Sequence, residues 1–275
     1  MSNIFKTALR RSLAQRLPPI EEVEAYGIDG EEAVYRLLCK HFSCVLRNPV
    51  VPHKELYLEK DFLVIEKGVP FVIEVKNWKG EITCEGDNFY QKKPNGTQKK
   101  QKSPVGTTRQ FIEKMRAFYS LSIPVFGIVA FLENECTLHL PKEMEGIALC
   151  TAAETISLIK KQAASAKTTA DPIDPSRILR CTRFYSRDSE FCKGILADCY
   201  FDCETQGGSL VRIDTTCLRY LTVENHPLLL KDKLYLTYTN GATDIFYNRD
   251  TVFTVACLDG SYQKIALHRI HHIVF

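Results

Sequence analysis

Hydrophobic and polar positions follow different patterns in the first and last parts of the chain. Up to about residue 162, apolar residues at helical spacing alternate with short runs of β-branched and aromatic residues. From residue 176 onward, strand-like alternations are separated by turn pairs such as Asn240-Gly241 and Asp259-Gly260. We therefore predict an α/β domain followed by an all-β barrel or sandwich.

The first domain is predicted to contain a central mixed sheet flanked by helices. Asp29 has the position of an N-cap, because acidic residues fill the next turn and Val34 and Leu38 follow at helical spacing. Strands are predicted at residues 45–51, 61–66, 71–76, 81–91 and 125–131, and further helices at 110–121 and 152–162. This order of elements is typical of an α/β sheet covered by helices.

Composition changes sharply between the two predicted domains. Residues 160–175 are mostly small and polar and include two Asp-Pro pairs, which is typical of an interdomain linker. The predicted organisation is a basic N-terminal helical segment at 1–26, an α/β domain at 27–162, a linker at 163–175 and a β-rich domain at 176–275.

Length, charge and cysteine content narrow the class of protein only a little. A chain of 275 residues can bury two modest cores, and its net charge of +3 is too small to indicate nucleic-acid binding by itself. No apolar run approaches the length of a bilayer span, and the N-terminal stretch lacks the apolar core of a secretory signal. Eleven scattered cysteines favour reduced thiols, so we expect a cytoplasmic protein with no membrane association.

The N-terminal segment has the pattern of a basic amphipathic helix. It covers residues 1 to about 17 and ends at Pro18-Pro19. Such a helix can lie on nucleic acid, on a partner or simply on the first domain as a solvated cap. The pattern does not choose among these possibilities.

The most informative stretch is a predicted hairpin between residues 61 and 76. Lys67-Gly68 supplies the turn, since glycine adopts positive φ without steric cost. The register that follows places Asp61 opposite Glu74, and Lys76 lies on the same face as Glu74 because side chains alternate along a strand.

Two carboxylates facing each other across a hairpin need a compensating charge. Directly opposed like charges destabilise a strand pair, and a divalent cation between Asp61 and Glu74 would offset the repulsion. The simpler interpretation is a surface hairpin with a contact between Glu74 and Lys76, usually worth under about 1 kcal/mol.

This arrangement resembles the Asp … Glu-x-Lys core of the PD-(D/E)xK nuclease superfamily, and in particular its nuclease-related domain, NERD. The resemblance covers roughly residues 27 to 160. It is carried by Gly30-Glu31 at a helix start, Asp61, Gly68, the run from Phe71 through Glu74-Val-Lys76-Asn-Trp-Lys-Gly-Glu to Ile82, Ser103-Pro104, and the strand from Pro124 to Phe131.

The resemblance implies a restriction-endonuclease-like fold and a metal-dependent nuclease. It assigns Asp61, Glu74 and the backbone carbonyl of Val75 to a Mg²⁺ or Mn²⁺ ion. Lys76 would position or activate water, through a pKa lowered by the metal or by desolvation, and Glu31 would assist. The alternative for Glu31 is that its charge merely complements the helix dipole.

The chain departs from the family pattern after Ser103-Pro104. The family commonly shows Asn-Pro followed by a glutamine at the start of the next helix. That glutamine is missing here, or its place is taken by Thr107, Thr108 or Gln110. A tryptophan expected after the strand at Glu81-Ile82 is replaced by Phe89. Because the metal-binding triad is intact, we interpret these changes as divergence rather than loss of activity.

Five lysines surround the turn at Asn95-Gly96, with no acidic residue among them. A flexible basic hairpin of this kind can follow a phosphate backbone, although a solvated charged loop is the common alternative. The five are Lys92, Lys93, Lys99, Lys100 and Lys102. Trp78, which follows the Glu-x-Lys strand, can stack on a base, but we favour a packing role.

Cysteines and histidines of the second domain do not form a recognisable site. Only one cysteine pair, Cys199 and Cys203, has a spacing resembling that of zinc ligands, so we interpret Cys181, Cys192, Cys199 and Cys203 as buried thiols. The triplet of His268, His271 and His272 lacks the partners of a catalytic triad.

The leading hypothesis is a cytoplasmic Mg²⁺- or Mn²⁺-dependent nuclease that acts on nucleic acid, with DNA favoured over RNA. Its β-rich domain would aid DNA binding, contact a partner protein or form a homo-oligomer. Two alternatives stay open. One is a non-catalytic nucleic-acid-binding or adaptor protein on a degenerate nuclease fold. The other is a protein-interaction scaffold built around the β-rich domain.

Overall fold

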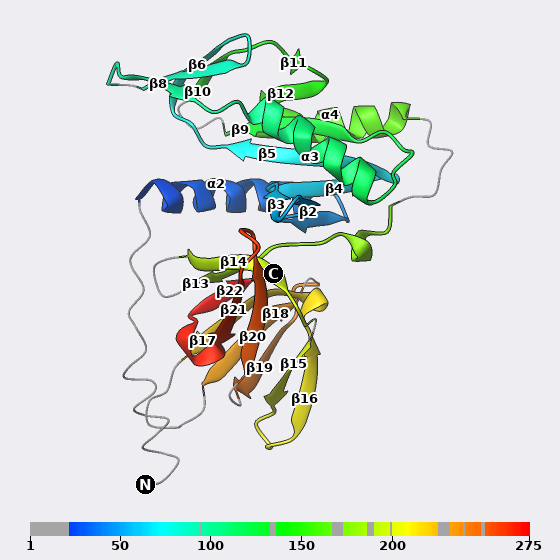
Figure 1. Ribbon diagram of the computed structural model, residues 1–275, viewed down its shortest axis with the longest axis vertical. Helices are drawn as coiled ribbons and strands as arrows, with labels where there is room; N and C mark the ends of the chain where they lie inside the picture. Colours follow the sequence, from blue (N-terminus) through cyan, green and yellow to red (C-terminus); the bar gives the residue numbers. More distant parts are fainter. Residues whose placement is uncertain are drawn as a thin grey trace. The chain divides into compact units, whose positions relative to one another are not determined.

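The computed structural model describes residues 22–93, 95–132, 136–166, 173–185, 190–198, 200–224, 232–238, 240–248 and 251–275. These residues form two compact units, divided between Arg180 and Cys181. Figure 1 shows the helices and strands of both units, and each unit has its own hydrophobic core. The predicted N-terminal helix at residues 1 to about 17 and residues 167–172 of the predicted linker lie outside the described residues.

A six-stranded mixed sheet forms the centre of the first unit. Its strands stand in the order β1-β4-β5-β9-β12-β11. Strands β5 and β9 are parallel, as are β9 and β12, whereas the other neighbours are antiparallel. The bounds are β1 Val45–Arg47, β4 Phe62–Glu66, β5 Val69–Lys76, β9 Phe126–Phe131, β11 Glu143–Met144 and β12 Ile147–Thr151.

Helices cover both faces of this sheet. Helix α3 (Pro104–Phe118) packs against one face, where Phe111 and Met115 join the sheet residues Val72 and Val129 in one core. Helices α2 (Glu22–Cys39) and α4 (Ala152–Ser165) share a second core with the opposite face. The expected mixed sheet flanked by helices is therefore present in the first unit.

Two smaller sheets complete the first unit. One has the order β10-β6-β7-β8 and packs its inner side chains, including Ile82 and Phe89, into the same core as α3. Its strands are β6 Gly80–Glu85, β7 Asn88–Lys92, β8 Gln98–Gln101 and β10 Cys136–His139. The other is the hairpin of β2 (Val50–His53) and β3 (Leu56–Glu59).

Several boundaries predicted from the sequence are wrong. Helix α2 begins at Glu22, so Asp29 lies within the helix and is not its N-cap. Helix α3 begins at Pro104 rather than residue 110, with Ser103 as N-cap accepting a hydrogen bond from the Gly106 N–H at 3.4 Å. The strand predicted at 81–91 is a hairpin, β6 and β7, whose turn contains Gly86 at φ 54°.

The chain after α4 returns to the first unit. Helix α4 continues to Ser165, beyond the expected start of the linker. Ile173 and Ile178 pack into the core beneath α3, and the Leu179 N–H donates to the Tyr119 hydroxyl at 2.9 Å. Residues 173–180 are therefore part of the first unit's packing.

The second unit is an antiparallel sheet of ten strands. Their order is β16-β15-β19-β18-β17-β22-β13-β14-β20-β21, so the C-terminal strand β22 lies between β17 and β13. The bounds are β13 Thr182–Tyr185, β14 Glu190–Leu196, β15 Tyr200–Glu204, β16 Leu210–Asp214, β17 Leu218–Glu224, β18 Lys233–Tyr238, β19 Thr243–Asn248, β20 Val252–Cys257, β21 Tyr262–Ala266 and β22 His272–Val274.

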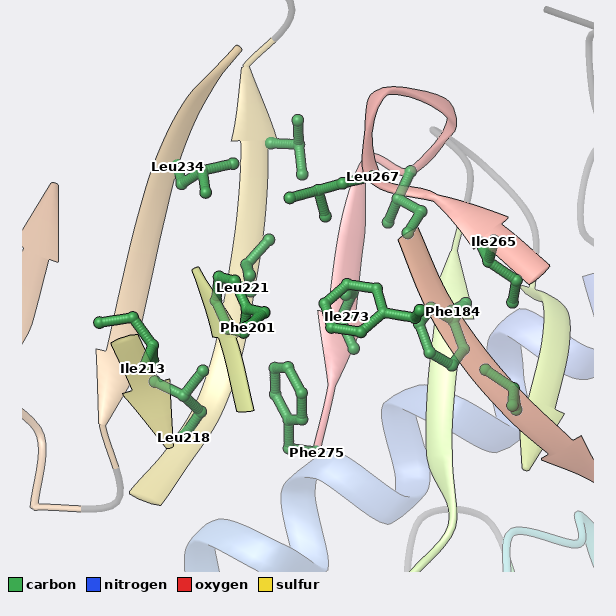
Figure 2. Packing of buried hydrophobic residues seen from close by; sticks show 14 of the residues in the cluster. Phe184, Phe201, Ile213, Leu218, Leu221, Leu234, Ile265, Leu267, Ile273 and Phe275 are labelled. Atoms are coloured by element: carbon green, nitrogen blue, oxygen red, sulfur yellow. The ribbon is translucent and has the colours of Figure 1, made fainter. Parts of the chain in front are cut away.

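This sheet curls around a single core. Ile213 on the edge strand β16 and Ile265 on the other edge strand β21 belong to one cluster of buried residues. Figure 2 shows these side chains and Phe201, Leu221 and Ile273 directed into the space that the strands enclose. The expectation of a β-rich C-terminal region is met, and one curled sheet forms it.

Candidate active site

The hairpin of β4 and β5 has the predicted register. Phe62 pairs with Ile73 and Glu66 with Val69, which leaves Lys67 and Gly68 as a two-residue turn. Both turn residues have positive φ, 51° for Lys67 and 77° for Gly68, which is the conformation of a type I′ turn. A right-handed strand twist favours this turn type, so local sequence determines the register at the site.

Asp61 lies immediately before β4, at the open end of the hairpin. Its carbonyl accepts a hydrogen bond from the Asn48 N–H at 2.9 Å, and the preceding Lys60 N–H donates to the Pro49 carbonyl at 3.0 Å. One oxygen of its carboxylate accepts the N–H of Val75 at 2.6 Å. The backbone contacts and the side-chain bond together fix the carboxylate beside β5.

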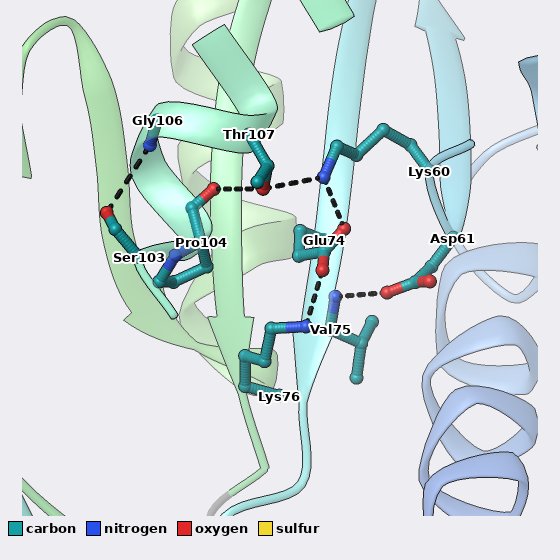
Figure 3. A network of polar contacts seen from close by, with 9 residues as sticks. All are labelled: Lys60, Asp61, Glu74, Val75, Lys76, Ser103, Pro104, Gly106 and Thr107. Carbon is teal, nitrogen blue, oxygen red and sulfur yellow. Dashed lines mark hydrogen bonds and ion pairs between the residues drawn. The ribbon is translucent and has the colours of Figure 1, made fainter. Parts of the chain in front are cut away.

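Glu74 stands between two lysines. Its Oε1 is bonded to the Lys76 ammonium, and its Oε2 accepts a hydrogen bond from Lys60 Nζ at 2.8 Å (Figure 3). Only 13% of the Glu74 side chain and 5% of the Lys60 side chain are exposed. The sequence indicated the Lys76 contact but not Lys60, since a lysine beside an aspartate gives no sign of burial.

Helix α3 reaches the site through its first turn. Lys60 Nζ also lies 3.1 Å from the hydroxyl of Thr107, which donates to the Pro104 carbonyl at 3.1 Å (Figure 3). Of the residues considered for the missing glutamine, Thr107 faces the site, Thr108 is fully buried and Gln110 is exposed. Thr107 therefore provides the contact between α3 and the charged cluster.

Glu31 approaches the cluster from α2. Its negative charge raises the pKa of both Asp61 and Lys76. Because α2 begins at Glu22, Glu31 lies beyond the first turn, and the alternative in which it merely complements the helix dipole is wrong. The neighbouring Glu32 points to a different partner, the buried Arg47, at 2.7 Å.

Gly30 allows α2 to come this close. A Cβ atom at Gly30 would lie 2.7 Å from Leu132 Cδ1 and 2.8 Å from Asn77 Nδ2. Asn77 directly follows Lys76 at the end of β5. The absence of a side chain at Gly30 thus permits the contact that places Glu31 next to the hairpin.

Electrostatics make Asp61 and Glu74 unequal. Burial, then the charges of Glu74 and Glu31, raise the pKa of Asp61 well above that of a free aspartate, and Lys76 only partly opposes them. Burial also acts to raise the pKa of Glu74, but Lys76 and Lys60 outweigh it and lower that pKa. Glu74 is therefore the ionised acid of the pair, and Asp61 is the one in need of a cation.

The pKa of Lys76 moves opposite to the expected direction. Desolvation acts to lower it, but Glu74, Asp61 and Glu31 together raise it above that of a free lysine. Lys76 is therefore an ammonium group at neutral pH and a hydrogen-bond donor. Desolvation alone does not turn it into a base.

The donor set at the hairpin suits a hard, hydrated cation. Among the described residues, no group of three or more His, Cys, Asp or Glu side chains has the arrangement of a chelating site. Mg²⁺ usually keeps several waters and takes one or two carboxylates, which Asp61 and Glu74 can provide. Burial, followed by the charges of Glu74 and Glu31, raises the pKa of Asp61, and a cation beside its carboxylate would oppose this shift.

The five predicted phosphate-binding lysines are exposed around the β7–β8 hairpin. Lys100 pairs directly with Tyr90 across these strands, and Lys92 contacts Glu81 at 3.2 Å. Strand β6 starts just after Lys76 and β8 ends just before Ser103. The basic hairpin is therefore inserted between the two segments that meet at the charged cluster.

Trp78 has a packing role, as expected. Its ring makes edge contacts with Phe89 and Phe131, with centroids 6.3 and 5.8 Å apart, respectively. Phe89, which takes the place of the family's tryptophan, is fully buried on β7. Trp78 thereby ties the small basic sheet to the central one.

Cysteines and histidines of the second unit pack within that unit. Cys181, Cys192 and Cys203 are buried, as expected for thiols of a core, and Cys199 lies outside the described residues. His272 stacks on Tyr185 at 4.4 Å, and burial followed by the nearby His271 lowers its pKa to about 4.

Comparison with protein families finds a match within the first unit. Residues 26–132 match the family model of the nuclease-related domain, a stretch that contains Glu31, Asp61, Glu74 and Lys76. The predicted family resemblance is thus confirmed for that stretch, and the β-rich unit lies outside the match. No curated protein matches the chain. No helix in the described part of the chain is long and apolar enough to cross a membrane.

A pair of glycine substitutions tests the close approach of α2. Gly106→Ala in α3 meets open space and should stabilise the protein by up to about 1 kcal/mol through helix propensity. Gly30→Ala must displace Leu132 and Asn77 and should cost about 1–2 kcal/mol despite the same propensity gain. Urea unfolding of both variants measures the difference. Equal effects at the two positions would contradict the packing role of Gly30.

Asp61→Asn tests the uncompensated charge in metal-free protein. A carboxyl whose pKa is raised on folding binds its proton more tightly in the folded state, so stability falls as pH rises above about 3.9, the pKa of a free aspartate. The asparagine can still accept the Val75 N–H. We expect Asp61→Asn to raise Tm by about 2–4 °C at pH 8 and by less at pH 5.

Thermal melts in a chelating buffer measure this effect, with the exposed Asp87→Asn as the control. A variant that is less stable than the wild type at both pH values would show that the Asp61 charge is compensated.

Proposed function

We propose that this protein is a metal-dependent nuclease that hydrolyses phosphodiester bonds in nucleic acid, with DNA as the favoured substrate. The proposal rests chiefly on one observation. Glu31, Asp61, Glu74 and Lys76 gather at the open end of a buried hairpin, inside the stretch that matches the nuclease-related domain.

The arrangement of elements is compatible with a restriction-endonuclease-like fold. The hairpin β4–β5 continues into the parallel pair β5–β9, and helices lie on both faces of the sheet. The acids come from the open end of one hairpin and from α2. This fold assignment supports the proposal but adds no chemistry to it.

Asp61, Glu74 and the Val75 carbonyl would hold a Mg²⁺ or Mn²⁺ ion. Bound there, the ion would lower the pKa of a water ligand and neutralise charge on the phosphate. The Val75 N–H keeps the Asp61 carboxylate oriented through its 2.6 Å bond, and Lys60 and Lys76 keep Glu74 ionised. Both carboxylates are therefore held in fixed positions at the open end of the hairpin.

Lys76 would act as a donor rather than as a base. Its ammonium is held by Glu74, and its raised pKa keeps it protonated at neutral pH. From this position it can orient the attacking water or contact a non-bridging phosphate oxygen. Glu31, whose charge acts on the same two groups, would accept a proton from water or carry an outer contact to the cation.

The basic hairpin would guide the substrate. Of its five exposed lysines, Lys92 lies on β7, Lys99 and Lys100 lie on β8, and Lys93 and Lys102 directly follow these strands. Phosphate groups along this surface would release counterions and position the scissile bond at the acids. A solvated loop remains the competing interpretation.

The second candidate function is non-catalytic binding of nucleic acid on the same fold. The two lysines that contact Glu74 favour this second function, because they compensate the charge of its carboxylate without a metal. The two functions differ in whether cleavage accompanies binding.

Cleavage assays on linear, nicked and supercoiled DNA with Mg²⁺ or Mn²⁺ separate the two functions. We expect metal-dependent cutting by the wild type and a loss of at least about 100-fold in Asp61→Asn and Lys76→Met. Lys67→Met, at the exposed turn of the same hairpin, serves as the control and should cut normally. Binding of metal and DNA without cutting by the wild type would establish the non-catalytic alternative.

Replacing the five hairpin lysines by glutamine tests the substrate path. If they contact phosphates, the slope of log K against log salt should become shallower by about 2–4, since each contact contributes about 0.9. Fluorescence anisotropy with a labelled DNA over a range of salt concentrations measures the slope.

The control removes the same amount of charge from other exposed lysines of the first unit. These are Lys40, Lys54, Lys67, Lys142 and Lys160. An equal change in slope for both sets would assign the effect to net charge and would contradict a specific path along the hairpin.

A further inference from the structure

Lys60 is a buried lysine in direct contact with the proposed metal ligand. Its side chain is 5% exposed, and its ammonium lies 2.8 Å from Glu74 Oε2 and 3.1 Å from the Thr107 hydroxyl. Burying an ammonium group is costly unless charge and hydrogen bonds compensate it. The burial of the Lys60 ammonium therefore depends on its contacts with Glu74 and Thr107.

The structure holds Lys60 at both ends. Its backbone N–H donates to the Pro49 carbonyl. Its ammonium donates to the Thr107 hydroxyl, which itself donates to the Pro104 carbonyl in the first turn of α3. Figure 3 shows the Lys60 side chain extended from the Asp61 side of the site to Glu74. The Lys60 ammonium is therefore held in one position, unlike the ammonium group of a lysine on the surface.

Lys60 and Lys76 occupy different oxygens of the same carboxylate. Lys76 is bonded to Oε1 and Lys60 to Oε2. The two positive charges face three negative ones, on Glu31, Asp61 and Glu74, when all are ionised. Without the positive charge of Lys60, the same cluster would hold three negative charges and one positive charge.

We propose that Lys60 serves as a built-in cation that takes the place of a second metal ion beside Glu74. This inference rests on the proposed function. Lys60 leaves the Asp61 side of the cluster as the place for one divalent ion, and it covers the Glu74 oxygen that a second ion would need. Lys60 acts through Glu74 and is a positioning residue.

Counting bound Mn²⁺ tests this proposal without any measurement of cleavage. Electron paramagnetic resonance of free Mn²⁺ gives the number of ions bound and their affinity in metal-free protein titrated at fixed ionic strength. The wild type should bind one ion per chain. Lys60→Met should bind its first ion at least about tenfold more tightly, because it removes a positive charge that lies 2.8 Å from the proposed ligand Glu74. Lys60→Met should also take up a second ion.

Two further variants separate charge from structure. Lys60→Arg keeps the positive charge and should return to one ion with wild-type affinity. Lys67→Met removes the same charge from the exposed turn of the same hairpin and should leave Mn²⁺ binding unchanged. If Lys60→Met does not fold, Thr107→Val keeps the shape of α3 but removes the hydroxyl that holds Lys60. It should then shift the Mn²⁺ affinity in the same direction.

The outcomes distinguish this inference from the proposed function. A wild type that binds one ion and a Lys60→Met variant identical to it would overturn the role of Lys60 alone. No binding in either would overturn both. Binding in Lys60→Met but not in the wild type would support the role of Lys60 and would overturn the metal dependence of the proposed function.

Discussion

The structure of the candidate site depends on two ammonium groups that share one buried carboxylate. Glu74 remains ionised away from water because Lys60 and Lys76 compensate its charge, and Glu74 in turn is the nearest negative charge to both buried ammonium groups. Removing any member leaves an uncompensated charge, so the backbone around the cluster must be fixed. The type I′ turn sets the register of β5 against β4, and the bonds from Lys60 and Asp61 to residues 48 and 49 fix the open end.

Segments distant in sequence reach this cluster because their backbones can approach it. Gly30 brings α2 against Asn77 at the end of β5, and the first turn of α3 brings the Thr107 hydroxyl to Lys60. The small basic sheet connects β5 to α3, with Trp78 packing it onto the central sheet. The same packing that closes the core therefore determines which polar groups meet, and an error of one helical turn in α2 would remove Glu31 from the site.

Local pattern was enough to predict the hairpin, its turn and the pairing of its acids. It was not enough for features that depend on tertiary contact. The sequence around Gly30 resembled a helix start, whereas α2 continues through this residue. The glycine is there because packing against Asn77 requires a small residue. Lys60 precedes an aspartate and has the pattern of a solvated residue, and only the meeting with Glu74 and Thr107 makes it buried. Likewise, alternation predicted the strands of the second unit, but the insertion of β22 between β17 and β13 depends on contacts across many residues.

The charge balance of the cluster connects metal binding to substrate binding. With Glu31, Asp61 and Glu74 ionised, the two lysines leave an excess of one negative charge. Burial first, and then the charges of Glu74 and Glu31, raise the pKa of Asp61 in the metal-free protein. A phosphodiester, itself negative, is repelled under these conditions. One divalent ion would reverse the sign of the cluster, and a second would be opposed by Lys60. Each ligand would then strengthen the binding of the other by the same factor, as linkage requires. On this view the buried lysine adjusts the cluster so that a single ion is sufficient to make it accept a phosphate.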